Sequence, residues 1–378
     1  MNKGLTSFRA LAFFAIFSFH ISNGSVGFGY IGVLAFFVLS GFLLTPILVN
    51  MKSNLNKKDF FIHFYGRRAL RIFPLYYSYV IIVASLSFLT IYRYVPAEII
   101  PVDRLKLIAQ LNRFIEQLPW TMTYTYDFLH ASKDYKGTPL ATHLWSLAVE
   151  EQFYLVWPLA IFFIPPNYLK KFLLFVIMAG PFIRLLLAIT LEANLLPALS
   201  RRDVVIYVLP FSHLDAFALG GYFSLYGKSR PSYFVWVFVL LVLMLGLVTS
   251  GLSTDRIYWD QLGYEPFMRD SYKYIWGYSV VNLMFAYMLV HIRDKTIMPA
   301  LLENPFLVYL GTISYGLYVF HLPIQWLARP MMHGLPEIVQ ASTILLITTI
   351  ISVISYEFME KRFINAKDKC FARTPADK

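Results

Sequence analysis

The chain has 378 residues, of which 58% are hydrophobic and 18% aromatic, and only 15% are charged. A soluble domain of this length would carry far more charge, so the composition excludes a water-soluble fold. The net charge of +11 would suit a nucleic-acid partner, but its distribution along the chain favours membrane topology, and no nucleic acid is expected.

Apolar runs long enough to cross a bilayer recur along nearly the whole sequence. The expected fold is an all-α, polytopic membrane helix bundle of about ten transmembrane helices. The expected spans are residues 5–21, 30–50, 72–94, 143–164, 170–191, 203–226, 233–250, 273–291, 306–328 and 337–360. With the N-terminus inside, the inner segments carry 19 of the 33 Lys and Arg residues and the outer loops 11, which predicts that both termini are cytoplasmic.

This pattern predicts a membrane domain over residues 1–360 and a basic cytoplasmic tail over residues 361–378. The only cysteine, Cys370, falls in that tail, so no disulfide framework can form. A covalent intermediate carried by a thiol is therefore not expected.

The first apolar run contains two ionisable side chains. Arg9 and His20 lie eleven residues apart in FRALAFFAIFSFH, residues 8–20, which is about three helical turns and about 16 Å of rise. Both are expected on one stripe of one helix, with Arg9 toward the cytoplasm. An ionisable group in an apolar span is costly unless it faces a polar interior, which favours a functional role. A snorkelling arginine and an interfacial histidine are the structural alternative.

Three arginines gather before the third expected span, in FYGRRALRIFP, residues 64–74. Arg67 and Arg71 are four residues apart, and Arg68 and Arg71 are three apart, so their guanidinium groups are expected at one cytoplasmic helix mouth. Clustered guanidiniums suit phosphate recognition. They also satisfy the positive-inside rule without any ligand, and the pattern leaves both interpretations open.

Two outer segments are long enough to carry a function. Residues 95–142 predict an amphipathic surface helix, because apolar residues recur there at helical spacing; they are Leu105, Ile108, Leu111, Ile115 and Leu118. Residues 251–272 mix aromatic rings with carboxylates, namely Tyr258, Trp259, Asp260, Tyr264 and Glu265. Such a mixture can bind sugars, whereas an interfacial aromatic belt is the more common explanation.

The fourth expected span begins in HLWSLAVEEQFYLVWP, residues 143–158. One polar face is expected from the spacing of His143, Ser146, Glu150 and Tyr154. Glu150 would lie about 11 Å into the bilayer, where it needs a cation or a water-filled cavity. Glu151 points about 100 degrees away, so the two carboxylates need not share a role. A structural pairing of Glu150 with Arg184 or another buried cation is the alternative.

The ninth expected span contains SYGLYVFHLP, residues 314–323. Ser314, Tyr318 and His321 are expected on one face of its helix, and Pro323 is expected to bend it. A single histidine of this kind is commonly a packed, hydrogen-bonded residue. The prediction of a polar interior shared by several helices therefore depends on all the motifs together.

These motifs, in this order, resemble the integral-membrane acyltransferase family 3, whose members move acyl groups, usually acetyl, onto cell-surface glycans. The resemblance covers essentially the whole chain. It rests on FRALAFFAIFSFH, GYIGVLAFFVLSGFLL at 29–44, RRALRIFPLYY at 67–77, HLWSLAVEEQFYLVWP and GTISYGLYVFHLP at 311–323. Larger members append an outer hydrolase-like domain, and the present sequence is expected to act without one, or together with a separate protein.

The resemblance implies that activity depends on Arg9, His20, Arg68, Arg71 and Glu150 or Glu151, and that acetyl-CoA is the usual donor. The expected reaction is O-acetylation of a glycan such as lipopolysaccharide O-antigen or exopolysaccharide, at the bacterial inner membrane and without a metal.

In that interpretation the donor phosphates meet Arg67, Arg68 and Arg71, and Ser146, Tyr154, Tyr318 and His321 face the substrates. His20 would act as general base or as a transient acetyl carrier, and the sequence does not separate these roles. Glu150 would orient the imidazole. A transporter that uses buried Arg, His and Glu, and a glycan-binding scaffold without activity, are the rival interpretations.

Overall fold

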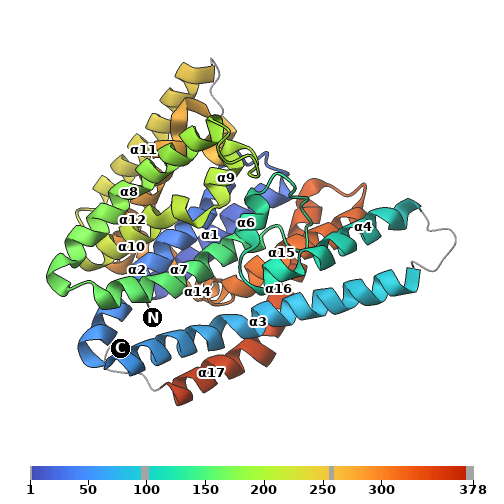
Figure 1. Ribbon diagram of the computed structural model, residues 1–378, viewed down its shortest axis with the longest axis horizontal. Helices are drawn as coiled ribbons and strands as arrows, with labels where there is room; N and C mark the ends of the chain where they lie inside the picture. The colour runs from blue at the N-terminus through green and yellow to red at the C-terminus, as the bar shows by residue number, and fades with distance from the viewer. Residues whose placement is uncertain (1, 95–101, 255–258, 372–378) are drawn as a thin grey trace. The chain divides into compact units, whose positions relative to one another are not determined.

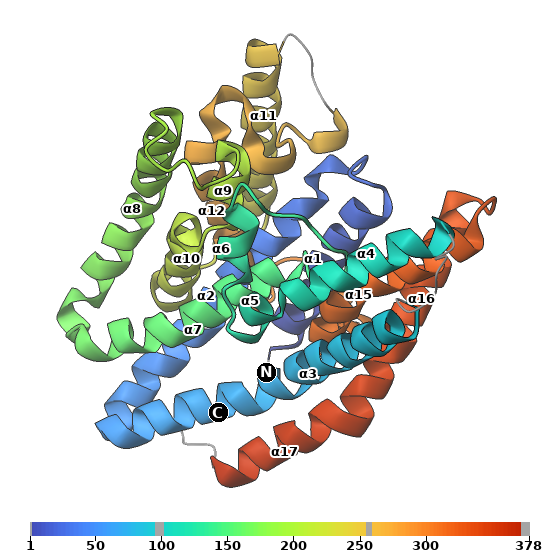
Figure 2. The ribbon, with the colours of Figure 1, turned by 45° about the vertical axis from the view of Figure 1, so that its right-hand side comes forward.

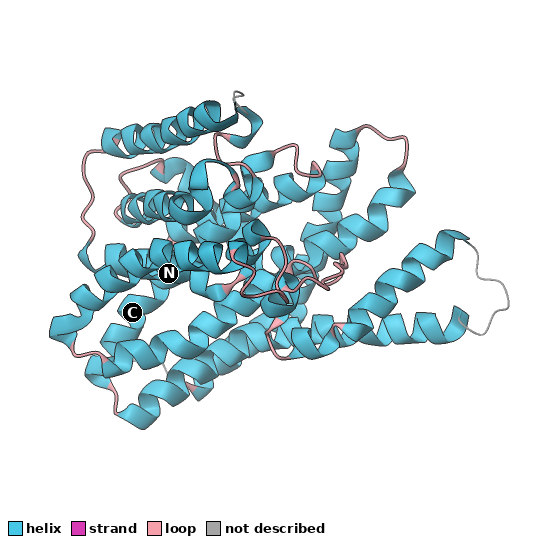
Figure 3. Ribbon diagram, turned by 45° about the horizontal axis from the view of Figure 1, so that its top comes forward, coloured by secondary structure: helices cyan, strands magenta, loops and turns pink. Residues whose placement is uncertain are grey.

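The computed structural model describes residues 2–94, 102–254 and 259–371, and these contain helices and loops but no strand (Figure 3). The helices are, in chain order, α1 (Lys3–Ile21), η1 (Gly27–Tyr30), α2 (Ile31–Asn54), α3 (Lys57–Tyr94), α4 (Val102–Glu116), α5 (Leu118–Met122), α6 (Tyr126–Ala131), α7 (Leu144–Phe163), α8 (Pro166–Glu192), α9 (Arg202–Val208), η2 (Pro210–His213), α10 (Leu214–Tyr226), α11 (Tyr233–Thr254), η3 (Trp259–Gln261), η4 (Pro266–Met268), η5 (Asp270–Tyr272), α12 (Lys273–Arg293), α13 (Pro299–Leu302), α14 (Pro305–Thr312), α15 (Ser314–Ala328), η6 (Arg329–Met332), α16 (Glu337–Ser355), η7 (Tyr356–Glu360) and α17 (Lys361–Cys370).

Seven helices among the described residues are long and apolar enough to cross a membrane, and two broken pairs would raise the number to nine. One pair is α9 with η2–α10, which is bent by 66°. The other is α14 with α15; its break lies at Ile313, not at Pro323, where the bend was expected. The expected span over residues 143–164 forms α7, which is not in this set and has Glu150 and Glu151 in its first half. The all-α polytopic bundle is confirmed.

The third helix begins earlier than the sequence suggested. Residues 51–71 were expected as an inner loop, but α3 starts at Lys57 and continues through Pro74 to Tyr94. The Asn56 side chain caps it by accepting a hydrogen bond from the backbone N–H of Asp59 at 2.9 Å. The three arginines of the RRALR motif therefore lie on a helix that is continuous with the span.

The outer segment contains the amphipathic helix that was expected there. This helix is α4, which ends at Glu116, and Ile108 and Leu111 on its apolar side are buried together with Phe114. The start of the segment, residues 95–101, lies outside the described residues.

By contacts, the described residues divide into two compact units. Among the described residues, unit 1 contains those up to Phe60 and those from Phe153 to Ser314. Unit 2 contains those from Phe61 to Gln152 and those from Tyr315 to Phe371. In Figure 1, unit 1 includes α1, α2, α8 and α10 to α12, and unit 2 includes most of α3 with α4, α15, α16 and α17.

Unit 1 is built on helices whose backbones touch. The α2 and α10 helices pack most extensively, and a methyl group built at Gly41 would lie 2.0 Å from the carbonyl oxygen of Phe217. At Gly220 the corresponding distance to the carbonyl oxygen of Val38 is also 2.0 Å. Glycine is needed at both positions because any side chain would have to push the helices apart.

Unit 2 is held by tyrosine hydroxyls of α3. Tyr76 donates to the carbonyl oxygen of Thr121 at 2.8 Å, and Tyr79 donates to that of Leu140 at 2.5 Å. The Tyr76 ring also stacks on Tyr124, with 4.2 Å between the ring centroids. In the same unit α16 continues through η7 into α17 (Figure 2).

Candidate functional site

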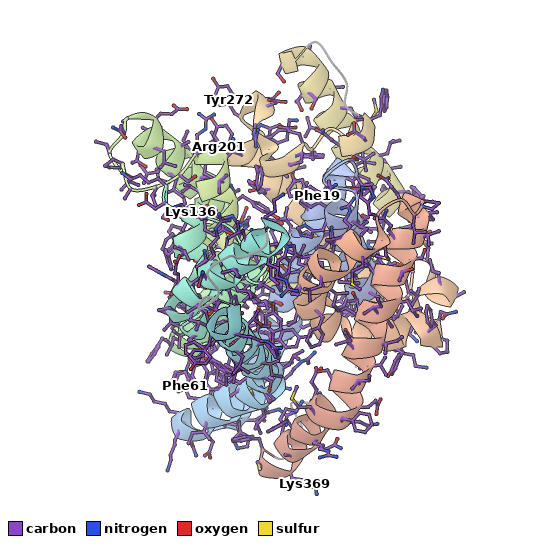
Figure 4. All side chains as sticks on the ribbon, turned by 90° about the vertical axis from the view of Figure 1, so that its right-hand side faces the viewer. Phe19, Phe61, Lys136, Arg201, Tyr272 and Lys369 are labelled. Carbon is purple, nitrogen blue, oxygen red and sulfur yellow. The ribbon has the colours of Figure 1, made fainter. Side chains whose placement is uncertain are left out.

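The α1 helix carries the two ionisable residues of the first motif. It is unbroken from Lys3 to Ile21, and the Asn2 side chain caps its start by accepting from the backbone N–H of Leu5 at 3.2 Å. Eleven residues correspond to about 16 Å of rise and about 20° of rotation, so Arg9 and His20 lie on one stripe. Both are half-buried, and the ring centroid of Phe19, labelled in Figure 4, lies 5.3 Å from that of His20.

The three arginines of α3 reach different partners. Arg67 donates from Nη1 to the carbonyl oxygen of Phe371 at 2.6 Å. Arg68 lies within electrostatic range of Glu151, and Arg71 lies within range of Glu360. The α3 arginines therefore form a row along one helix, and each guanidinium already faces a specific group.

Glu151 lies among polar and charged side chains of unit 2. Beside Arg68, its electrostatic neighbours are Glu150 and the phenol groups of Tyr76, Tyr77, Tyr124 and Tyr315. Glu150 and Glu151 are both half-buried on α7. A carboxylate next to a guanidinium and several hydroxyl groups can bind or orient a polar substrate. No group of three or more His, Cys, Asp or Glu side chains within the described ranges is arranged to hold a metal ion.

Arg184 is not the partner of Glu150, contrary to one interpretation of the sequence. It is fully buried in unit 1, where it forms an ion pair with Asp215 at 2.9 Å. Its remaining donors reach Ser279 and the carbonyl oxygens of Ser212 and Ile275. All five N–H groups of a guanidinium are thus used, so none is left for a second carboxylate.

Ser146, Tyr318 and His321 meet in one buried hydrogen-bonded cluster of unit 2. The hydroxyl groups of Ser146 and Tyr318 share a hydrogen bond, and Tyr318 also donates to the carbonyl oxygen of His143 at 3.0 Å. A ring nitrogen of His143 lies 2.9 Å from the carbonyl oxygen of Val319. The rings of His143 and His321 are 5.6 Å apart at 74°, so the cluster fastens the start of α7 to α15.

His321 is completely buried, and its Nδ1 lies 2.6 Å from the carbonyl oxygen of Tyr318. This is the packed histidine that the sequence allowed as an alternative. Tyr154, the fourth expected substrate residue, lies in unit 1, where its hydroxyl is 3.3 Å from that of Ser40.

A buried carboxyl group in the outer segment escaped sequence analysis. Gln152 donates from its amide to Asp127 and to the carbonyl oxygen of Tyr124, both at 2.9 Å. Burial raises the pKa of Asp127 to about 7, and burial lowers the pKa of nearby His130 to about 4. Asp127 follows a tyrosine-rich stretch with no recognisable motif, and the only signal is that it is an acidic residue in the first turn of α6.

The aromatic and acidic segment before α12 is largely structural. Glu265 forms a buried ion pair with Lys273, which also donates to Ser250 and to the carbonyl oxygen of Gly263, both at 2.7 Å. Tyr264 is buried and donates to the carbonyl oxygen of Val242 at 2.8 Å. The sugar-binding interpretation is therefore wrong for these two residues. Trp259 and Asp260 are exposed, and Tyr258 lies outside the described residues.

Comparison with known proteins gives one matching family and several related proteins. A family model described as an acyltransferase domain matches residues 2–357. The O-acetyltransferase OatA of Staphylococcus aureus is 26% identical over 99% of the chain. The putative peptidoglycan O-acetyltransferase YrhL of Bacillus subtilis is 26% identical over 98%, and the peptidoglycan O-acetyltransferase OatA of Listeria monocytogenes is 29% identical over 93%. The chain spans 59%, 56% and 54% of these relatives, and no solved structure shows a significant match.

Proposed function

Because the chain belongs to the integral-membrane acyltransferase family 3, we propose that it transfers an acetyl group from acetyl-CoA to a hydroxyl group of a cell-surface glycan. The observation that carries this proposal is the family match over residues 2–357, which includes every motif quoted above. The names of the relatives, all O-acetyltransferases, support acetyl as the acyl group.

In the proposed reaction, the arginine row of α3, which consists of Arg67, Arg68 and Arg71, binds the phosphates of the donor from the cytoplasmic side. The acceptor hydroxyl attacks the thioester carbonyl, the acetyl–sulfur bond breaks, and the CoA thiolate leaves and takes up the proton. His20 accepts the proton of the hydroxyl in a general-base route. In a carrier route, its imidazole first takes the acetyl group and then passes it to the hydroxyl.

The proposed acceptor is a glycan exposed at the surface of a bacterial inner membrane, such as lipopolysaccharide O-antigen or exopolysaccharide. Two of the relatives are named for peptidoglycan, which makes peptidoglycan the acceptor to compare first. Mass spectrometry of the surface glycans from cells with and without the gene would identify the acetylated sugar.

The first experiment uses the purified protein in liposomes with acetyl-CoA radiolabelled in the acetyl group. Wild-type protein is expected to release CoA and to transfer label to an added glycan. His20→Ala is expected to lower transfer by at least about a hundredfold, the usual contribution of a general base. His333→Ala is a matched control, because His333 is exposed and lies outside the five motifs quoted above.

Two results would contradict the proposal. One is normal transfer by a correctly inserted His20→Ala protein. The other is movement of a solute across the liposome membrane without any consumption of acetyl-CoA, which would support the transporter. Label that stays on the protein without acceptor, and is absent in His20→Ala, would select the carrier route.

A further inference from the structure

Four polar atoms deep in unit 1 have no hydrogen-bond partner among the described residues. They are the hydroxyl oxygens of Tyr30 and Tyr278 and both the nitrogen and the oxygen of the Asn282 side-chain amide. Tyr278 and Asn282 are fully buried, and Tyr30 is 3% exposed. Buried polar groups are nearly always hydrogen-bonded, so these three side chains, here called the polar triad, call for a partner from outside the described part of the chain.

The members of the polar triad lie close together. Tyr278 and Asn282 are four residues apart on α12, so they share one face of that helix. Tyr30 is an electrostatic neighbour of Tyr278. The ring of Tyr207 packs beside both tyrosines, with its centroid 5.6 Å from that of Tyr30 and 6.3 Å from that of Tyr278. A single ligand can therefore reach all three side chains.

The charged groups around the polar triad are already paired. The charged neighbours of Tyr278 are a guanidinium group and two carboxylates, and each of them forms an ion pair. The pairs are Arg184–Asp215, Asp203–Arg269 and Glu265–Lys273. The triad itself is neutral and offers both donors and acceptors. These properties suit a neutral polar group such as an amide, and not a phosphate or a carboxylate.

Contacts between α1 and α12 establish how the two helices run past each other within unit 1. A methyl group built at Gly4 would lie 2.9 Å from the side chain of Ile292. The ring centroids of Phe8 and Phe285 are 6.0 Å apart. A later residue of α1 thus contacts an earlier residue of α12, so the helices are antiparallel.

This register gives the level of the polar triad along α1. Continued beyond the two contacts, it places Asn282 level with about residues 11–14 of α1, and Tyr278 about one turn nearer to the end of α1. Both levels fall between those of Arg9 and His20. The unpaired polar atoms of α12 therefore lie at an intermediate depth in the bundle.

A donor that brings its thioester from the cytoplasmic side to His20 has to pass this depth with its pantetheine arm. The arm contains two amide groups, which a β-alanyl linker separates by about 5 Å when extended. The four residues from Tyr278 to Asn282 correspond to about 6 Å of helical rise, which matches this separation. Amide groups that enter a membrane interior need hydrogen-bond partners, and the polar triad offers them.

We propose that Asn282 binds the pantetheine amide farther from the thioester, and that Tyr278, with Tyr30 beside it, binds the nearer one. This inference rests on the proposed acetyl-CoA-dependent function. The triad has almost no exposed surface, so α12 has to move away from its neighbours when the arm enters. The unpaired polar atoms lower the free energy of this opening, because they gain hydrogen bonds when the arm reaches them.

The test measures binding of S-ethylpantetheine, a thioether with both amides and no acyl group to transfer, to the full-length protein in nanodiscs. The comparison ligand is S-ethyl-N-acetylcysteamine, which keeps only the amide nearer the sulfur. Asn282→Leu is expected to weaken binding of S-ethylpantetheine about fivefold and to change that of the shorter ligand less than about twofold. Tyr278→Phe should weaken binding of both ligands by similar factors.

Thermal unfolding without ligand separates a binding role of Asn282 from a structural one. Asn282→Leu replaces an unpaired amide with an apolar group of similar size, so the unfolding temperature should stay the same or rise. Thr348→Val is the matched control, because it removes a buried hydroxyl of unit 2 that donates to the carbonyl oxygen of Ile344 in its own helix at 2.7 Å. It should change the Kd of either ligand less than about twofold.

Three outcomes would overturn the inference. They are no binding of S-ethylpantetheine by the wild type, an equal effect of Asn282→Leu on both ligands, and a lower unfolding temperature of ligand-free Asn282→Leu. A separate assay of acetyl transfer tests the proposed function. An unchanged kcat/KM for acetyl-CoA in Asn282→Leu would uphold that function and contradict the role of the triad. Asn282-dependent binding of S-ethylpantetheine by a wild-type protein that transfers no acetyl group would do the reverse.

Discussion

Asp127 couples the stability of the outer segment to pH. One of its carboxylate oxygens accepts from Gln152, and the other has no hydrogen-bond partner among the described residues. Burial raises its pKa from 3.8 to about 7. Between these two pH values the unfolded chain loses the proton while the folded protein keeps it, so stability falls as pH rises. The total loss is about 4 kcal/mol, at about 1.4 kcal/mol per pH unit.

Asp127→Asn should remove this dependence, because the amide cannot ionise and its oxygen can still accept from Gln152. The variant and the wild type are expected to unfold at similar temperatures near pH 4. At pH 8 the variant should be the more stable protein. Thermal unfolding in detergent, followed by fluorescence at both pH values, measures the difference. An unfolding difference that is the same at both pH values would contradict the assigned pKa.

The charged residues also show which part of the site could be predicted. The sequence revealed that Arg184 needs a partner, because a lone guanidinium in an apolar span is costly. It could not reveal that the partner is Asp215, since that pairing depends on how α8 packs against α10. The same holds for Glu265, whose aromatic neighbours suggested a sugar site until Lys273 supplied the countercharge.

At the scale of elements, the contact between α2 and α10 is a close and extensive backbone contact within unit 1. Gly41→Ala is expected to destabilise the protein by at least about 2 kcal/mol, because the helices must separate and lose packed contacts. Gly316→Ala in α15 is the control: its nearest neighbour would be 3.2 Å away, a gap that a small shift can relieve. Thermal unfolding of the two variants checks the prediction. Equal, small losses would contradict a close backbone contact.

Helix boundaries were harder to predict than helix positions. The arginine row was expected in a loop because charge usually marks the end of a span, yet the helix starts after Asn56, well before the expected span begins at residue 72. The π-helical turn η7 has no local sequence signal, since its residues would also suit an α-helix. The order of motifs nevertheless predicted the fold class and the family, because hydropathy and motif spacing do not depend on where a helix begins or ends.

At the scale of the whole molecule, the positive-inside pattern predicts a cytoplasmic C-terminus, and the single cysteine provides the test. Cys370 is exposed at the end of α17. A membrane-impermeant maleimide should label it in inside-out vesicles and leave it unlabelled in intact spheroplasts. Cys370→Ser should abolish the labelling of inside-out vesicles. Labelling from outside intact cells would reverse the topology and place the donor site on the wrong side of the membrane for cytoplasmic acetyl-CoA.

The π-turn at Tyr356–Glu360 has one more consequence. Such a turn contains one residue more than an α-turn, and each residue of an α-helix advances the next by about 100°. The wide turn therefore absorbs the extra residue, and the helix that follows keeps nearly the same angular phase. Deleting one residue of Tyr356–Glu360 should restore a regular α-turn and leave α17 in nearly the same orientation, whereas deleting one residue within α17 should rotate everything after it by about 100°. A change in chain length is accordingly tolerated better at this turn than in the helices on either side of it.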